Sequence, residues 1–104
     1  MVSEETLNEI TRRIVNGFHP DKIILFGSQA RGTADKHSDV DILVISPVEG
    51  DRFDLILDMY KSLKGMLLAR DIVVLEPDEF ELDRQIPGTI ARPAWKEGRI
   101  LYER

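Results

Sequence analysis

The chain has 104 residues, of which 42% are apolar and 32% charged, and its formal net charge is −5 at pH 7. This length suits one domain, and the composition is typical of a soluble globular protein rather than a disordered one, so we expect residues 1–104 to share a single core. An acidic chain without a block of Lys and Arg is not expected to bind nucleic acid in general, although a nucleotide could bind with the help of metal ions.

The sequence also disfavours membrane-spanning and secreted proteins. No apolar stretch approaches the length needed to cross a bilayer, and Met1 leads into a polar, acidic segment rather than a signal peptide. The absence of Cys excludes a disulfide framework and a thiolate metal site. We therefore expect a cytoplasmic protein.

The beginning of the chain predicts a helix, a strand and a tight turn. Ser3 is a suitable N-cap for a helix whose apolar residues recur with helical spacing, at Leu7, Ile10, Ile14 and Phe18. The apolar run KIILF, residues 22–26, ends at Gly27 and is typical of a buried strand. A short turn or helix is expected to begin at Ser28.

The middle of the chain predicts a second strand and the longest helix. A polar loop over residues 36–38 leads to the apolar run DVDILVI, residues 39–45, which has the character of a strand. Residues 51–69 then predict an amphipathic helix. Its apolar stripe is expected to consist of Phe53, Ile56, Leu57, Tyr60, Leu63 and Leu67.

The last third of the chain completes an alternation of helices and strands. Residues 71–76 predict a third strand, residues 77–86 a short helix, and residues 99–103 a final edge strand. This order predicts an α/β (α+β) domain with helices packed on one sheet. The stretch 41–71 has the length of a strand–helix–strand crossover, so the second and third strands should be parallel or close together.

Two aspartates at the start of the second strand are the most informative feature of the sequence. Side chains alternate along a strand, so Asp39 and Asp41 should point to the same side, where like charges repel. Carboxylates placed in this way suit Mg²⁺, which keeps positions for water and substrate phosphates. A solvated strand start is the alternative interpretation.

A third acid, Asp71, opens the third strand as Asp39 opens the second. If the two strands are adjacent, three carboxylates converge at one end of the sheet. They could hold two metal ions about 4 Å apart, an arrangement used for in-line phosphoryl displacement. Alternatively, Asp71 pairs with Arg70 or another base at a loop.

The turn Gly27-Ser28 lies between the first strand and a short helical segment. Glycine allows the backbone to approach a ligand closely, and the amides at a helix start favour a phosphate. The hydroxyl of Ser28 can also donate to a phosphate oxygen. Taken alone, Gly-Ser after a strand is more often an ordinary turn.

Residues 27–45, GSQARGTADKHSDVDILVI, resemble the signature of the nucleotidyltransferase superfamily that shares the palm-like fold of DNA polymerase β. The signature is Gly-Ser, about ten further residues, Asp-x-Asp, and a third carboxylate on a later strand. Asp39 and Asp41 match the pair, and Asp71 matches the third acid. The whole chain resembles the minimal form of the superfamily, the small prokaryotic MNT proteins. This resemblance implies a palm fold, with a small mixed sheet flanked by helices.

The resemblance also implies a role for each residue. Asp39 and Asp41 would bind two Mg²⁺ ions, which Mn²⁺ could replace, and through them the triphosphate of ATP. Asp71 would ligate the catalytic metal and help to deprotonate the attacking hydroxyl. The Gly-Ser turn would hold the β- and γ-phosphates. Arg31 could reach a phosphate, although an exposed helical Arg is equally compatible with a solvated side chain.

MNT proteins are usually partnered with a HEPN-domain protein in toxin–antitoxin pairs. The resemblance therefore implies an antitoxin that moves AMP from ATP to a tyrosine of a HEPN toxin. Larger members of the superfamily use a further helical domain to hold the base or acceptor, so here those sites are expected to be open, completed by a partner, or built across an oligomer. Two alternatives stay open: a module that silences its partner by steric contact, and a transferase that modifies a small molecule. The presence of all three acids favours the enzyme, because a binding module has no physical need for a clustered negative site.

Overall fold

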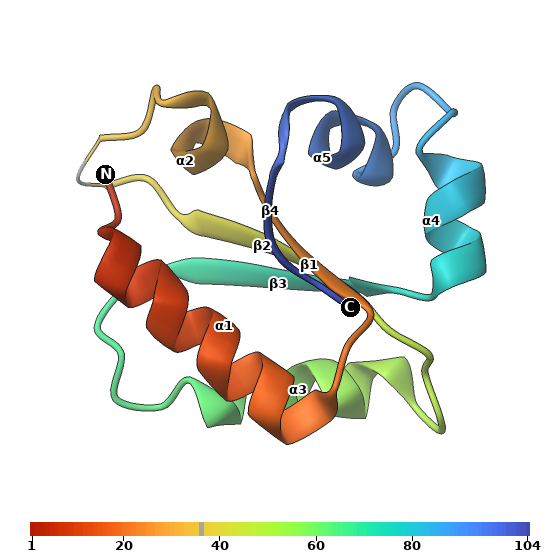
Figure 1. Ribbon diagram of the computed structural model, residues 1–104, viewed down its shortest axis with the longest axis horizontal. Helices are drawn as coiled ribbons and strands as arrows, with labels where there is room; N and C mark the ends of the chain where they lie inside the picture. The colour runs from red at the N-terminus through yellow and green to blue at the C-terminus, as the bar shows by residue number, and fades with distance from the viewer. Residues whose placement is uncertain (36) are drawn as a thin grey trace.

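Figure 1 shows the computed structural model, which describes residues 1–35 and 37–104. In chain order the elements are α1 (Glu4–Phe18), β1 (Lys22–Phe26), α2 (Gly27–Arg31), β2 (Val40–Ile45), α3 (Arg52–Ser62), β3 (Arg70–Leu75), α4 (Pro77–Asp83), α5 (Ala91–Glu97) and β4 (Arg99–Glu103). All of the predicted helices and strands exist. Helix α5 lies where the sequence predicts none, and the loop expected at residues 36–38 lies partly outside the described residues.

The four strands form one mixed sheet in the order β3-β2-β1-β4. Strands β2 and β3 are parallel, whereas β1 is antiparallel to both β2 and β4. Helix α3 provides the crossover that a parallel pair requires. The expected fold class is therefore confirmed, as is the position of β4 at an edge of the sheet.

Helices cover the two faces of this sheet as separate layers. In Figure 1, α1 and α3 lie below the sheet and α2, α4 and α5 lie above it. Below the sheet, α1 and α3 bury apolar side chains against one face of β1, β2 and β3; these include Ile10, Ile14, Ile23, Leu25, Ile42, Val44, Met59 and Val74. Above it, Phe80 of α4 and two alanines of α5 pack on the other face, against Ile24, Leu43 and Ile45.

The first helix follows its sequence signals closely. The side chain of Ser3 accepts a hydrogen bond from the backbone N–H of Thr6, as an N-cap does. Leu7, Ile10 and Ile14 are buried against the sheet, as their spacing predicts.

Helix α3 differs from its prediction in length and in its buried side. It ends at Ser62 rather than near residue 69. Gly65, whose φ is +91°, breaks the helical backbone just beyond this end. The guanidinium of Arg70 then donates to the carbonyls of Leu63, Met66 and Leu68 and holds this segment as an irregular connection. The buried stripe is centred on Met59 and Leu63, so the expectation that Phe53, Leu57 and Leu67 belong to it is wrong; these three are 66%, 41% and 100% exposed.

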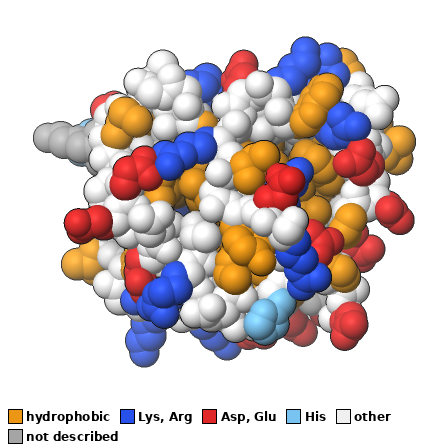
Figure 2. Space-filling model, in the orientation of Figure 1, with side chains coloured by type: hydrophobic (Ala, Val, Ile, Leu, Met, Phe, Trp, Pro, Cys, Tyr) orange, Lys and Arg blue, Asp and Glu red, His pale blue; other side chains and the backbone are white. Residues whose placement is uncertain are grey.

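Smaller differences concern the ends of other elements. Strand β2 begins one residue later than predicted and β3 one residue earlier, while α4 ends at Asp83 instead of residue 86. On the face shown in Figure 2, basic and acidic side chains are interspersed, so this face has no basic stripe for a nucleic-acid backbone. Within residues 1–35 and 37–104, no helix has the length and apolar character needed to cross a membrane.

Candidate active site

Two aspartates lie side by side at one end of the sheet. Asp41 and Asp71 are register partners in the parallel pair β2–β3, and each is the second residue of its strand. Because neighbouring strands lie about 4.8 Å apart, the two carboxylates are close neighbours. Asp41 shares its face with Leu43, which packs in the layer of α4 and α5. The pair therefore lies on the α4/α5 side of the sheet.

Asp39 occupies a different structural position. It lies just before β2, and its side chain is exposed. The parallel pairing of β2 with β3 begins one residue later, at Val40, whose N–H donates to the carbonyl of Ala69 at 3.0 Å. The position of Asp39 therefore depends on the loop that precedes it as well as on the sheet.

The electrostatic environment of Asp41 shows that these acids act on one another. Burial raises the pKa of the Asp41 carboxyl, and the negative charges of Asp71 and then Asp39 raise this pKa further. Arg31 is the smaller opposing influence and lowers the same pKa. A partly buried carboxylate with two acidic neighbours favours a bound cation.

The donor set fits Mg²⁺ in part. Carboxylate oxygens are the hard ligands that this ion prefers, and the ion normally keeps several positions for water and phosphate oxygens. Among residues 1–35 and 37–104, no three His, Cys, Asp or Glu side chains are arranged to hold an ion by themselves. Metal binding at Asp39, Asp41 and Asp71 would therefore be completed by oxygens of a bound triphosphate.

The glycine of the turn touches one of these acids. Gly27 follows β1, whose last residue Phe26 pairs with Asp41. Its φ of +72° belongs to the left-handed region, and a Cβ at this position would lie 2.2 Å from Oδ2 of Asp41. A side chain at this position would be strained and would displace the carboxylate, so the turn lies directly against Asp41.

The rest of α2 supplies polar groups at the same end of the sheet. Ser28 follows Gly27 and is partly exposed, and Phe26 at the N-cap position gives the helix no side-chain hydrogen bond. The amides of the first turn thus have no side-chain cap. Arg31 is exposed, and its Nη1 lies 3.9 Å from Oε2 of Glu97 in α5. This ion pair is weak, so the guanidinium can be drawn to an anion.

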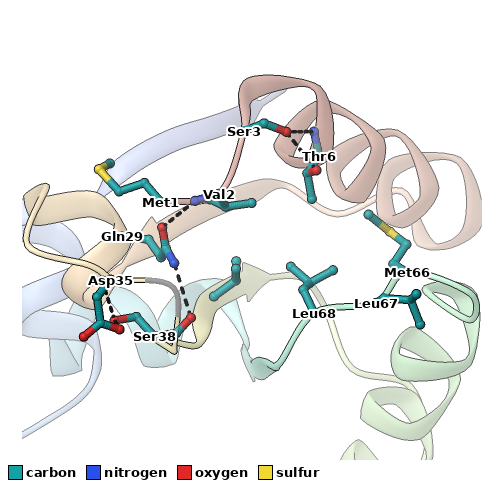
Figure 3. Close-up of a pocket in the computed structure, with 11 residues that line it drawn as sticks. Met1, Val2, Ser3, Thr6, Gln29, Asp35, Ser38, Met66, Leu67 and Leu68 are labelled. Atoms are coloured by element: carbon teal, nitrogen blue, oxygen red, sulfur yellow. Dashed lines mark hydrogen bonds between the residues drawn. The ribbon is translucent and has the colours of Figure 1, made fainter.

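Gln29 is a buried polar residue whose role sequence reasoning misses. The residue is 6% exposed, and both ends of the side-chain amide form hydrogen bonds. Oε1 accepts from the backbone N–H of Val2 at 3.0 Å, and Nε2 donates to the carbonyl of Ser38 at 3.3 Å (Figure 3). Burying an amide without such partners costs roughly 1–3 kcal/mol. A single Gln within a short polar segment carries no sequence signal of this burial.

The same close-up shows a cavity beside Gln29. Its volume is about 450 Å³, and its wall includes Val2, Met66 and Leu68. Those three residues pack against the core of the α1/α3 layer. Gln29 and Ser38 also line it, so the cavity lies between the α1/α3 layer and the segment that leads to Asp39.

Comparison with known proteins agrees with this geometry. Residues 4–101 match the model of the nucleotidyltransferase domain family. The chain belongs to this family. It is also 38% identical, over 84 residues, to a Methanocaldococcus jannaschii protein provisionally named a protein adenylyltransferase; the match covers 78% of this chain and 77% of that protein.

Solved structures show the same nucleotidyltransferase fold. A Sulfolobus solfataricus protein, provisionally named a nucleotidyltransferase, superposes with a TM-score of 0.66 at 25% identity, covering 95% of this chain and 79% of that one. A toxin–antitoxin structure with AMP-PNP superposes with a TM-score of 0.56 at 22% identity, covering 94% of this chain and 73% of that one. A mutant of the toxin–antitoxin pair MntA–HpeT gives 0.58 at 20% identity, with the same coverage. At these last identities the likeness concerns the fold alone.

The raised pKa of Asp41 leads to a prediction about the stability of this nucleotidyltransferase. Asp41→Asn should unfold with a free energy about 0.5 kcal/mol higher than the parent at pH 7, because it removes a like-charge contact between strands. An acid whose pKa is raised by folding disfavours the folded state once it ionises. The gain should therefore disappear at about pH 3, below the pKa of about 3.9 of an unfolded-state Asp, where the carboxyl is mostly protonated in both states.

Urea unfolding at the two pH values measures this difference. Asp58→Asn is a suitable control, because Asp58 is an exposed acid on α3, on the other side of the sheet. A marked loss of stability in Asp41→Asn at pH 7 would show that the carboxylate is held by favourable contacts instead.

Proposed function

We propose that this nucleotidyltransferase is a Mg²⁺-dependent enzyme that moves AMP from ATP to a tyrosine hydroxyl of a partner protein, a HEPN-domain toxin. The observation that carries the proposal is the pairing of Asp41 with Asp71 in register, in contact with the Gly27 turn. A cation held by this pair would lie next to a phosphate held by the turn, as transfer from a nucleoside triphosphate requires.

The comparisons support a protein as the acceptor, without identifying its class or the modified residue. The Methanocaldococcus jannaschii relative is named for transfer of an adenylyl group to protein, and two proteins that share the fold belong to toxin–antitoxin pairs. A toxin partner is consistent with both. The tyrosine, the HEPN class of the partner and the choice of ATP come from the resemblance of the Gly-Ser and Asp-x-Asp pattern. A reaction that consumes ATP also favours the cytoplasm as its location.

Each residue of the site has a proposed task. Asp39 and Asp41 would hold two Mg²⁺ ions, for which Mn²⁺ could substitute, and Asp71 would share the catalytic one. When bound, these ions supply positive charge that offsets the charge of the triphosphate and acidifies the acceptor hydroxyl. The amide of Gly27 and the hydroxyl of Ser28 would hold the β- and γ-phosphates, with Arg31 as a further cation.

In the reaction, the acceptor oxygen forms a bond to the α-phosphorus. The bond from that phosphorus to the oxygen bridging to the β-phosphate breaks, and pyrophosphate leaves on the opposite side. Asp71 would accept the proton of the acceptor hydroxyl. The protein thus contributes position and electrostatics and forms no covalent intermediate.

Calorimetry tests the metal and nucleotide sites together. ATP should bind the parent at least about tenfold more tightly with Mg²⁺ than without it, because the carboxylates alone repel a triphosphate. The double variant with Asp39→Asn and Asp41→Asn should lose this dependence. ATP binding that is independent of metal and unchanged in the double variant would contradict the proposal.

Two other functions give different results in a transfer assay. A steric antitoxin would bind its partner without modifying it, whereas a small-molecule transferase would use ATP with a small hydroxyl compound and leave the partner unchanged. Intact-mass analysis of the partner after incubation with ATP and Mg²⁺ separates the proposed enzyme from both alternatives, which leave the mass of the partner unchanged. Pyrophosphate release from ATP in the presence of small hydroxyl compounds then separates the two alternatives. The addition of one AMP to a tyrosine is the result that we expect.

A further inference from the structure

The contacts of Gln29 suggest a role beyond filling the interior of α2. Its amide spans two segments that are distant in sequence, the start of the chain at Val2 and the loop at Ser38 (Figure 3). The amide has a fixed polarity here. The oxygen must face the N–H of Val2 and the nitrogen must face the carbonyl of Ser38, so a carboxylate could serve only the first of these contacts.

We infer that Gln29 is a positioning residue that sets the place of Asp39 relative to the Gly27-Ser28 turn. This inference rests on the proposed function, because it gives Asp39 its task. The carbonyl that Gln29 holds belongs to Ser38, the residue that immediately precedes Asp39. Gln29 itself lies in α2, one residue after Ser28. One buried amide thus connects the proposed phosphate turn to the peptide that carries the first metal-binding acid.

The loop supports this peptide from its other side. The N–H of Ser38 donates to the carbonyl of Asp35 at 3.2 Å, and the N–H of Asp35 donates to Oγ of Ser38 at 3.0 Å. These bonds shape the loop internally but do not fix it to the domain. The bond from Gln29 does so, because it comes from an element that packs on the sheet.

Asp41 provides an internal contrast. Its place follows from the pairing of β2 with β1 and β3, which does not involve Gln29. Loss of the Gln29 amide should therefore loosen Asp39 selectively, while Asp41 and Asp71 stay in register. A general packing defect would instead affect the whole sheet.

Two variants test the inference. Gln29→Glu keeps the size of the side chain but replaces the donor to Ser38 by a carboxylate oxygen, and Gln29→Leu removes both hydrogen bonds while preserving an apolar filling of the site. Gln85→Leu is a matched control, because Gln85 is an exposed glutamine between α4 and α5. If Gln29→Glu fails to fold, Gln29→Leu decides the question.

The first measurement is hydrogen exchange of the free protein, without metal or nucleotide. The amides of residues 38–40 should exchange about tenfold faster in both Gln29 variants, while those in the middle of β1 and β2 keep the parent rate. The second is titration with Mn²⁺ in the presence of a non-hydrolysable ATP analogue. Its half-saturation concentration should rise about tenfold, as expected when one ligand is misplaced.

Faster exchange at residues 38–40 together with weaker Mn²⁺ binding, and parent-like values in Gln85→Leu, would support the inference. Parent-like exchange in both Gln29 variants would overturn it, as would faster exchange with unchanged Mn²⁺ affinity. A parent that does not bind Mn²⁺ with the ATP analogue would overturn the proposed function instead. The exchange rates would then still decide whether Gln29 holds the peptide before Asp39.

Discussion

Asp71→Asn should abolish nucleotide transfer while keeping most of the affinity for ATP. Asp71 lies beside Asp41 in the parallel register, and we assign it the proton of the acceptor hydroxyl and a share of the catalytic metal. Asparagine has nearly the same size but can neither accept that proton nor carry the charge. A rate loss of about a thousandfold is expected, since a general base alone contributes roughly 10²–10⁴. ATP affinity should change far less, because Asp39, Asp41 and the Gly-Ser turn remain.

Single-turnover transfer to the partner protein, followed by intact mass, measures the rate, and calorimetry with Mg²⁺ measures the affinity. Asp58→Asn, an acid on α3, is the control and should behave as the parent. Asp71→Asn also separates an enzyme from a steric antitoxin. If Asp71→Asn protects cells from the proposed toxin partner as fully as the parent, and the recovered partner is unmodified in both cases, the protein acts by binding alone.

Gly27→Val should weaken nucleotide binding by at least about a hundredfold. A Cβ at this position would lie 2.2 Å from Oδ2 of Asp41, and the φ of +72° disfavours any side chain, above all a β-branched one. The substitution therefore displaces the turn, the carboxylate or both. Ser28→Ala removes a single donor and should cost about tenfold or less.

Gly32 is a matched control for the backbone effect. Its φ is +77°, yet nothing lies within 4 Å of the position of its Cβ. Gly32→Val should therefore lower the free energy of unfolding by about 1–2 kcal/mol through backbone strain while leaving nucleotide affinity close to the parent value. Titration with a fluorescent ATP analogue and thermal unfolding measure the two quantities. Equal losses of affinity in both variants would assign the effect to backbone strain, and retained affinity in Gly27→Val would exclude the turn as a phosphate site.

Elements with strong local signals are the ones that the sequence predicts correctly. Helix α1 begins directly after its capping residue Ser3, and its buried apolar residues keep helical spacing. Strands β1 and β2 are apolar runs bounded by turn residues. The neighbouring positions of Asp41 and Asp71 follow from the crossover length and from their matching places near the starts of two strands. These features depend on the local chain and on one general rule of topology, so they can be deduced without coordinates.

Features that depend on distant contacts are less accessible to sequence reasoning. Gly65 marks the end of α3 locally, but the path of the connection that follows depends on Arg70, whose guanidinium binds three of its carbonyls, and no helix propensity encodes that contact. The face of α3 that is buried contains Met59 rather than Phe53, and this choice depends on how α3 packs against α1 and the sheet. Gln29 is similar, because both of its partners lie in other segments.

The place of β3 at the edge of the sheet gives Asp71 a second physical consequence. The outer backbone groups of an edge strand can pair with a strand of another molecule, and charged side chains on the edge discourage such self-association. Apart from Arg70 and Asp71, this strand consists of IVVL, a sequence with high β-propensity. The acid proposed to serve the chemistry thus also disfavours pairing of this edge with a strand of another molecule. Neutralising it leaves an edge whose one remaining charge is at its first residue, and concentrated samples of such a variant should be the first to form oligomers.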